Sequence, residues 1–410
     1  MDDPQDRCLR LTWRENSPGL GVMLATVGLL AFGVVMVTSA VSSLTEAKSF
    51  FLRRDVKHDI FVLVSLAVLV TVWRFDYRRL VPKDRGFPWL LATFFALAIF
   101  SGLLVYVPGI GRSVGGRHRW VSVAVGGTAI GFQPSEVITM AMVFFLSAWL
   151  TRREAQPKSF FKGFVPGMLV VAISSGAVIR ENFSMGVLIA ATGFAALFLA
   201  GVRWPYLVTA FLAACGPAYV MMRTSPVRWQ RIQALLNPWD PANPAAYQAR
   251  QSLLTIMTGG DFGKGLGNGM LKRGFVPESH TDFIFSVFCE EWGLIGAVLL
   301  VALVVLWIWQ ARRAAGCTRD PFGRSLAGSL GFLIALQAIM HVAVDLVAFP
   351  PTGIGCPFIS FGGTRLVTTA AATAIIISVS AHRVANEDLP DLAPTPADPP
   401  RSRPSTAQPA

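Results

Sequence analysis

Ten runs of mostly apolar residues constrain the fold of this chain more than any other feature. Most are roughly 17–25 residues long, which is the length that a helix needs to cross about 30 Å of hydrocarbon. Hydrophobic residues make up 53% of the 410 residues. The sequence therefore predicts an all-α polytopic membrane protein with about ten transmembrane helices, rather than a soluble protein of two or three domains. We place the spans near residues 18–41, 58–73, 87–107, 134–150, 162–179, 183–201, 205–222, 283–310, 326–348 and 365–381.

One connection is much longer than the others and joins the seventh span to the eighth. It runs from Arg223 to Asp282 and contains many prolines, tryptophans and arginines. Loops of that length are usually functional or disordered, and the aromatic and glycine content here favours an ordered cap. We divide the chain into a polar N-terminal segment (1–17), a membrane domain (18–382, with the large loop at 223–282) and a Pro-rich tail (383–410). The tail has the composition of a disordered segment.

Lysine and arginine in the connections indicate the orientation in the membrane. Their excess on one side predicts that both termini are cytoplasmic and that the large loop is extracytoplasmic. Arg53, Arg54 and Lys57 fall on the outer side, where such charge would suit an anionic lipid headgroup. The first span is too long for a signal-peptide core, which predicts an uncleaved helix.

Several classes of site are not indicated. The five cysteines contain no CxxC pair, so neither a disulfide framework nor a zinc site is predicted. The glycine-rich stretch at 263–269 lacks the preceding strand and the Lys-Ser/Thr ending of a P-loop. Nothing in the sequence indicates a nucleic-acid partner.

Acidic residues mark the start of the eighth span. Asp282 lies where the apolar run begins, and it is either an N-cap of that helix or a functional carboxylate at the membrane surface. Glu290 and Glu291 lie about 12–14 Å deeper. Buried charges cost several kcal/mol unless they are paired or face water. The two glutamates therefore either line a polar interior or pair with Arg365 or another basic residue.

Three further charged sites each have two open interpretations. Glu136, at the start of the fourth span, suits a helix N-terminus but could also face a cavity. His341 and Asp345 are four residues apart on one helical face, which fits a hydrogen-bonded pair or metal ligands. Arg180 and Glu181 occupy a short outer turn as a solvated pair or a functional one.

The segment from Pro350 to Gly363 leads into the last span, yet its three prolines and four glycines exclude a regular helix. Irregular backbone at that depth is tolerated only when it is buried in protein or lines a cavity. We expect a shaped re-entrant or capping loop near the outer face; the alternative is a plain connector.

Five ordered motifs between about residues 20 and 382 resemble the SEDS family of bacterial shape, elongation, division and sporulation proteins, which includes FtsW and RodA. They are Arg119-Trp120 with Gln133-Pro134-Ser135-Glu136; Tyr247-Gln248 with Gln251-Ser252; Gly263-Lys264-Gly265-Leu266-Gly267; Pro277-Glu278 with Thr281-Asp282-Phe283-Ile284-Phe285 and Glu290-Glu291-Trp292-Gly293; and Pro357-Phe358-Ile359-Ser360-Phe361-Gly362-Gly363-Thr364.

This resemblance implies a ten-span fold in the bacterial cytoplasmic membrane and peptidoglycan glycosyltransferase activity on lipid II. It also implies a class B penicillin-binding protein (a transpeptidase) as partner, within a division or elongation complex. The Asn237-Pro238-Trp239 stretch and the Pro-rich tail favour the FtsW branch. Three positions depart from the family pattern: Thr139 replaces a common lysine, Asn182 replaces an aspartate and His341 replaces an asparagine.

The resemblance assigns the catalytic aspartate to Asp282, which we expect to act as general base on the attacking sugar hydroxyl. Arginine, lysine or a divalent cation (Mg²⁺ or Mn²⁺) would hold the pyrophosphate, with Lys264 and Arg119 as candidates. The other predicted substrate-binding residues are Glu136, Glu278, His280, Glu290, Glu291, Ser360, Gly362 and Gly363. Two alternatives are a flippase for lipid II or a similar polyprenyl-linked sugar, and a catalytically weakened scaffold that recruits a transpeptidase.

Overall fold

The computed structural model describes residues 8–10, 15–42, 53–114, 117–125, 128–270 and 280–384. Ten helices lie at the positions of the ten predicted spans. They are α1 (Ser17–Ser42), α2 (Arg54–Val72), α3 (Trp89–Leu103), α4 (Pro134–Leu150), α5 (Val165–Ile179), α6 (Phe183–Leu199), α7 (Trp204–Arg223), α10 (Ile284–Gly316), α11 (Pro321–Asp345) and α12 (Gly363–Ala381). Within the described residues, seven helices are long and apolar enough to cross a membrane, and α4 and α6 are shorter apolar helices. Short helical turns lie at η3 (Tyr77–Leu80), η4 (Leu104–Tyr106) and η5 (Phe160–Phe164).

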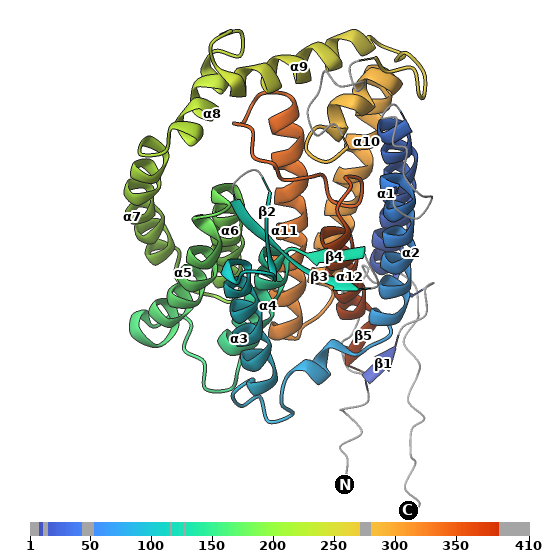
Figure 1. Ribbon diagram of the computed structural model, residues 1–410. Helices are drawn as coiled ribbons and strands as arrows, with labels where there is room; N and C mark the ends of the chain where they lie inside the picture. The colour runs from blue at the N-terminus through green and yellow to red at the C-terminus, as the bar shows by residue number, and fades with distance from the viewer. Residues whose placement is uncertain are drawn as a thin grey trace, which may run out of the picture.

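The large loop and the two ends of the described chain lie at opposite ends of the helix bundle (Figure 1). Two helices, α8 (Pro226–Leu236) and α9 (Pro244–Gly259), lie in the described part of the loop. At the other end, strand β1 (Cys8–Arg10) pairs antiparallel with β5 (His382–Val384), directly after the last helix. The predicted placement of the termini on one side and the large loop on the other is consistent with this arrangement.

A three-stranded antiparallel sheet between α3 and α4 was not predicted. It consists of β2 (Gly111–Val114), β3 (Arg117–Val125) and β4 (Thr128–Phe132), in the order β2-β3-β4. From Val121 to Val125, valines alternate with a serine and an alanine, which is the period of a strand and is the signal that could have revealed it.

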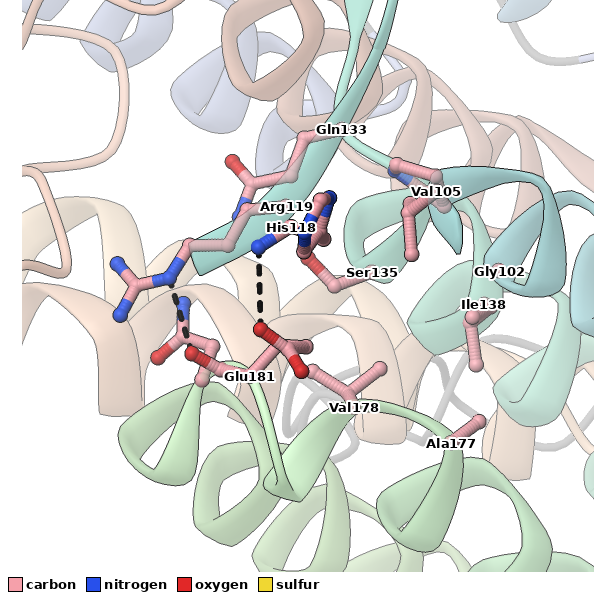
Figure 2. A pocket seen from close by; sticks show the side chains of 12 residues that line it. Gly102, Val105, His118, Arg119, Gln133, Ser135, Ile138, Ala177, Val178 and Glu181 are labelled. Carbon is pink, nitrogen blue, oxygen red and sulfur yellow. Dashed lines mark hydrogen bonds between the residues drawn. The ribbon is translucent and has the colours of Figure 1, made fainter. Parts of the chain in front are cut away.

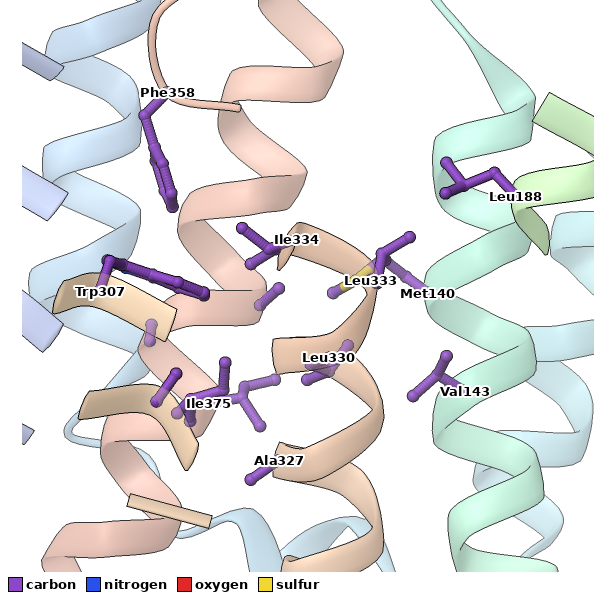
Figure 3. Packing of buried hydrophobic residues seen from close by; sticks show 14 of the residues in the cluster. Met140, Val143, Leu188, Trp307, Ala327, Leu330, Leu333, Ile334, Phe358 and Ile375 are labelled. Atoms are coloured by element: carbon purple, nitrogen blue, oxygen red, sulfur yellow. The ribbon is translucent and has the colours of Figure 1, made fainter. Parts of the chain in front are cut away.

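Helix α11 lies in the interior and packs against α4, α6, α10 and α12. Figure 3 shows Leu330, Leu333 and Ile334 of α11 pointing toward residues of these neighbours. In contrast, only 6% of the residues in the membrane-spanning stretch of α7 are buried, and this helix stands at the edge of the bundle (Figure 1). The core therefore leaves one apolar helix largely unpacked.

Helix α10 is interrupted at Gly293, where the backbone is not helical (φ 67°, ψ −169°). The loop after α9 replaces the missing helical hydrogen bonds. The amides of Lys264 and Gly265 donate to the carbonyls of Glu290 and Glu291, at 2.9 and 3.0 Å. On the other side of the break, the amides of Leu294 and Ile295 donate to the carbonyls of Gly260 and Asp261, at 2.9 and 3.2 Å. Broken helices persist in membrane proteins only when their free backbone groups are satisfied in this way.

Glycines make this close approach possible. A Cβ atom on Gly293 would lie 2.3 Å from the Gly263 amide nitrogen, and one on Gly263 would lie 2.2 Å from the Glu291 carbonyl oxygen. Both glycines also have a positive φ, which other residues rarely adopt. The glycine-rich stretch at 263–269, here called the plug loop, therefore fills the break in α10 with its own backbone.

We predict that Gly293→Ala destabilises the protein strongly. The backbone conformation alone should cost roughly 1–3 kcal/mol, and the contact with Gly263 should add to it. Thermal unfolding of the detergent-purified protein would measure the loss. The matched control is Gly216→Ala in α7, where a Cβ meets nothing within 4 Å. Equal melting temperatures for the two variants would contradict the proposed role of the plug.

Candidate active site

Asp282 lies half-buried just before α10, at the end of the bundle that carries α8 and α9. A Cβ atom on Gly353 would be 3.4 Å from its Oδ2 atom, so the carboxylate lies against the irregular segment 350–362. Helix α10 has Phe283, not Asp282, in its N-cap position, and the Phe283 side chain makes no cap hydrogen bond. The Ser286 amide in the first turn donates instead to Oδ2 of Asp345, at 2.9 Å. The structure thus gives the N-cap position to Phe283, and the functional role of Asp282 stays a prediction.

His280 is a buried neighbour of this carboxylate. Its Nε2 lies 3.3 Å from a guanidinium nitrogen of Arg54, and its carbonyl accepts from the Phe361 amide at 3.0 Å. Nearby, the Arg53 guanidinium hydrogen-bonds to the Asp55 carboxylate and lowers the pKa of that group. Arg53 and Arg54, at the start of α2, therefore lie at the same end of the bundle as Asp282.

The segment 350–363 is buried, as expected for a shaped loop, and is not a surface connector. The Cys356 amide donates to the Ser360 hydroxyl at 2.7 Å, which closes a tight turn. Phe358 has a positive φ of 65° and is 2% exposed, with its ring 5.6 Å from that of Trp307 (Figure 3). A Cβ on Gly363 would lie 2.4 Å from the Phe61 ring. Ser360 and Gly363 thus have packing contacts in this segment, and Gly362 is the N-cap of α12.

Glu136 is 4% exposed and forms an ion pair with Arg365 of α12, with 3.0 Å between Oε1 and Nε. Arg365 also passes directly beneath Gly355, where a Cβ would lie 2.2 Å from its guanidinium. Arg365, which was one predicted partner for Glu290 or Glu291, pairs with Glu136 in the structure. This ion pair joins α4, α12 and the buried segment.

We predict that Glu136→Gln lowers the free energy of unfolding by about 3–5 kcal/mol, because it leaves the Arg365 charge buried without its carboxylate. A double-mutant cycle would measure the coupling. Replacement of both partners, in Glu136→Leu with Arg365→Met, should cost much less than the sum of the single changes. Additive losses of melting temperature would contradict this.

Glu290 and Glu291 are buried, and their side chains also bind the plug loop. Lys264 Nζ is 2.7 Å from Glu290 Oε1, and the Met270 amide donates to the same oxygen at 3.0 Å. Glu291 accepts from the Ser39 hydroxyl at 2.7 Å and from the Gly267 amide at 3.2 Å. These contacts favour the structural interpretation of both glutamates, with Lys264 as the basic partner.

Arg119 and Glu181 link the sheet to the turn between α5 and α6. Figure 2 shows the Arg119 Nε and the His118 amide donating to Glu181, to its carbonyl and carboxylate at 3.0 Å each. The next residue, Asn182, caps α6 by accepting from the Met185 amide at 3.3 Å. Glu181 therefore hydrogen-bonds to the sheet and is not simply a solvated partner of Arg180.

A cavity of about 360 Å³ lies beside this turn, between α6, α7, α8, α11 and residues 349–352. Three arginines line it: Arg119, Arg228 and Arg231. Arg228 donates to the carbonyls of Met221 and Arg180, both at 3.1 Å, and its guanidinium lies over the Phe183 ring. Arg231 donates to the Pro351 carbonyl at 2.8 Å. The cavity is therefore strongly basic at the end of the bundle that carries α8 and α9.

An apolar groove of about 1370 Å³ continues from this cavity along the unpacked helix α7. Val187 and Ala218 line both spaces, and Trp204 lies at the far end of the groove. Its walls are mostly apolar residues of α6, α7, α10 and α11. The two spaces together form an apolar channel with a basic head.

The predicted site residues thus fall into different groups. Asp282 lies against Gly353. Two residues earlier, the Pro351 carbonyl accepts a hydrogen bond from Arg231, which lines the basic cavity, so Asp282 lies near that cavity. Arg119 lines that cavity, whereas Lys264, Glu290 and Glu291 belong to the plug. Sequence reasoning missed Arg228 and Arg231, although the Arg-rich helix in the large loop was a signal. Glu278 lies outside the described residues.

No further ligand in the described part of the chain supports a metal-binding role for His341 and Asp345. Among the described residues, no group of three or more His, Cys, Asp and Glu side chains is placed to hold a metal ion. His341 Nε2 is 3.7 Å from Asp345 Oδ2, which fits a charge pair more closely than a ligand set.

Comparison with known sequences identifies relatives over nearly the whole chain. Residues 21–385 match the model of a family described as "Cell cycle protein", which groups FtsW, RodA and SpoVE. The probable peptidoglycan glycosyltransferase FtsW of Geobacter sp. (strain M18) is 36% identical over 366 residues, covering 88% of this chain and 95% of the relative. The protein of the same name from Coxiella burnetii is 34% identical over 366 residues, with the same coverage.

Solved structures share the fold at lower identity. A chain of a peptidoglycan synthase complex, from work on the structural coordination of polymerization and crosslinking, has a TM-score of 0.70 at 22% identity, covering 88% of this chain and 97% of that chain. The rod shape determining protein RodA of Thermus thermophilus has a TM-score of 0.61 at 20% identity, covering 88% and 95%. These likenesses confirm the predicted polytopic helical fold. The sequence relatives confirm the resemblance that the motifs indicated. This chain belongs to the FtsW, RodA and SpoVE family of cell cycle proteins.

Proposed function

We propose that this multi-pass membrane protein is a peptidoglycan glycosyltransferase that polymerises lipid II at the outer face of the bacterial cytoplasmic membrane. The relatives named FtsW support this activity and a role in septal wall synthesis. The observation that carries the proposal is the apolar groove that ends in an arginine-lined cavity, whose lining residue Thr352 directly precedes the Gly353 that lies against Asp282.

The shape and charge of this channel fit a polyprenyl pyrophosphate. The long apolar chain suits the groove along α7, which lies open at the edge of the bundle. Arginine is suited to pyrophosphate because its planar guanidinium binds phosphate oxygens through two parallel hydrogen bonds. Arg119, Arg228 and Arg231 would then hold the headgroup of the donor substrate.

The reaction needs one base and a stabilised leaving group. The acceptor sugar hydroxyl attacks the anomeric carbon of the donor, and a new C–O bond forms there. The bond from that carbon to the pyrophosphate oxygen breaks, and the polyprenyl pyrophosphate leaves with the electron pair. Asp282 takes the hydroxyl proton, and the arginines stabilise the departing charge. Direct displacement inverts the anomeric configuration.

A divalent cation stays a prediction. Mg²⁺ is usually bound through one or two carboxylates together with substrate phosphates, rather than by an all-protein cage. The donor pyrophosphate would supply most of its ligands, which fits a protein whose described residues contain no three-ligand group. No step above depends on it.

The proposal extends to partner and orientation. The likeness to a chain of a peptidoglycan synthase complex supports a class B penicillin-binding protein as partner. Since the basic cavity and Asp282 lie at the end with α8 and α9, we place that end outside and both termini in the cytoplasm, consistent with the loop charges.

We predict that Asp282→Asn abolishes polymer formation without unfolding the protein, because the amide cannot accept the hydroxyl proton. Purified wild type and variant would be incubated with labelled lipid II and Mg²⁺ or Mn²⁺, with and without the transpeptidase, and glycan chains resolved on a gel. Asp261→Asn, which removes an exposed carboxylate from the loop after α9, is the matched control. Polymer from Asp282→Asn would refute the base assignment. Absence of polymer from wild type, with lipid II flipping in liposomes, would favour a flippase.

We predict that Arg231→Gln lowers kcat/KM for lipid II by roughly 10–100-fold, because a hydrogen bond to a charged group contributes about 1.5–3 kcal/mol. Inhibition by added polyprenyl pyrophosphate should weaken in parallel, since the same headgroup is recognised. Arg250→Gln in α9, outside the cavity, is the control. If product inhibition is unchanged in Arg231→Gln, the pyrophosphate does not bind in this cavity.

A further inference from the structure

A histidine and an aspartate are buried together behind Asp282. His341 and Asp345 of α11 are both 0% exposed, and His341 Nε2 is 3.7 Å from Asp345 Oδ2. Each side chain also holds a neighbouring segment: His341 Nδ1 is 3.0 Å from the Ile354 carbonyl, and Asp345 Oδ2 accepts from the Ser286 amide. The pair therefore contacts both the start of α10 and the segment that touches Asp282.

The hydrogen bonds determine where protons can be. A carbonyl oxygen only accepts, so His341 Nδ1 must carry a proton toward Ile354. Nε2 then faces the Asp345 carboxylate, and neither Nε2 nor Asp345 Oδ1 has a hydrogen-bond partner among the described residues. Two lone pairs opposed at full burial are unfavourable, and a buried carboxylate without a cation is costly. The pair must therefore hold one additional proton.

Few other charges are within reach of this pair. Asp282 directly precedes the first turn of α10, whose Ser286 amide donates to Asp345, and the thiols of Cys289 in α10 and Cys356 in the buried segment are the other titratable groups beside the pair. Arg365 of α12 lies on the His341 side, and its charge is matched by Glu136 of α4. Helix α9 contributes only the Ser252 hydroxyl, which donates to the Asp345 carbonyl, and α6 has no charged residue. Of the described carboxylates, Asp282 is thus the one that Asp345 can influence directly.

We infer that His341 and Asp345 form a buried ion pair that tunes Asp282 as a base: the His341 proton lets Asp345 stay negatively charged, and this charge makes the Asp282 carboxylate a stronger proton acceptor. Two nearby carboxylates raise the proton affinity of one another, and here the second carboxylate is held in place by the α10 amide. Both residues act through Asp282 and are positioning residues, not catalytic ones. The inference depends on the proposed function of Asp282.

Conservative variants separate this electrostatic role from a purely structural one. In His341→Asn the amide nitrogen can replace Nδ1 as donor to Ile354, but Nε2 is lost. In Asp345→Asn the amide oxygen can still accept from Ser286, but the charge is lost. His341→Gln and Asp345→Thr are second variants, used if the first do not keep the wild-type melting temperature. Val342→Ala, half-buried on another face of α11, is the matched control.

The experiment is the pH dependence of lipid II polymerisation by the full-length protein in liposomes. Without the Asp345 charge, Asp282 loses its proton more easily, so the acid limb should move to lower pH by roughly 0.5–1 unit, and the plateau rate should fall. His341→Asn should show the same shift, because an Asp345 without its cation takes up a proton. The double variant should shift no further than either single one.

The outcomes distinguish the two levels of the proposal. If wild type makes polymer, Asp282→Asn does not, and both variants have the wild-type pH profile, the ion pair has no role in tuning and the inference is overturned while the function stands. A shift of the acid limb to higher pH also overturns it. If wild type itself makes no polymer, the proposed function has failed.

Discussion

The break of α10 at Gly293, and the loop that fills it, determine how the end of the bundle that carries α8 and α9 is built. In hydrocarbon, an unsatisfied amide or carbonyl costs several kcal/mol, so a helix can stop only where another backbone supplies partners. Here residues 260–265 supply them on both sides of the break. Because this loop follows α9 directly, the break also fixes α9 against α10, where Ser252 hydrogen-bonds to Ser286 at 2.6 Å. Backbone bonds thus hold α10 at its break, and side-chain hydrogen bonds to Ser286 hold its first turn.

Buried charges are expensive, and the buried glutamates Glu136 and Glu290 are each paired with a basic residue of another element. Glu290 is matched by Lys264 of the loop after α9, and Glu136 by Arg365 of α12. The Glu136–Arg365 pair joins helices that are far apart in sequence, whereas Lys264 and Glu290 are only 26 residues apart. Removing one member of such a pair leaves an uncompensated charge, which is why these contacts specify the arrangement of helices more than they add net stability.

The candidate active site combines a rigid part and an open part. Asp282 and the segment 350–362 rest on the buried centre of the bundle, around α11 and α12. The basic cavity and the apolar groove lie on the other side, where α7 is scarcely packed. A carboxylate on a fixed support, next to a channel open at the bundle edge, suits a substrate with a reactive headgroup and a long lipid tail.

The sequence by itself determined the ten apolar helices, the long loop, the buried irregular segment before α12 and the motif family, because length, hydropathy and prolines act locally. It also singled out Asp282, since one carboxylate at the start of a span is visible in a linear pattern. It did not reveal the sheet at 111–132, the plug role of the 263–269 glycines, or the basic cavity. From the sequence, Lys264 was a candidate ligand of the pyrophosphate and Arg365 a candidate partner of Glu290 or Glu291. A sequence shows which residues are charged, but it does not show which residue each charge contacts. Only the tertiary structure decides which cation meets which carboxylate, since that depends on contacts between helices more than a hundred residues apart.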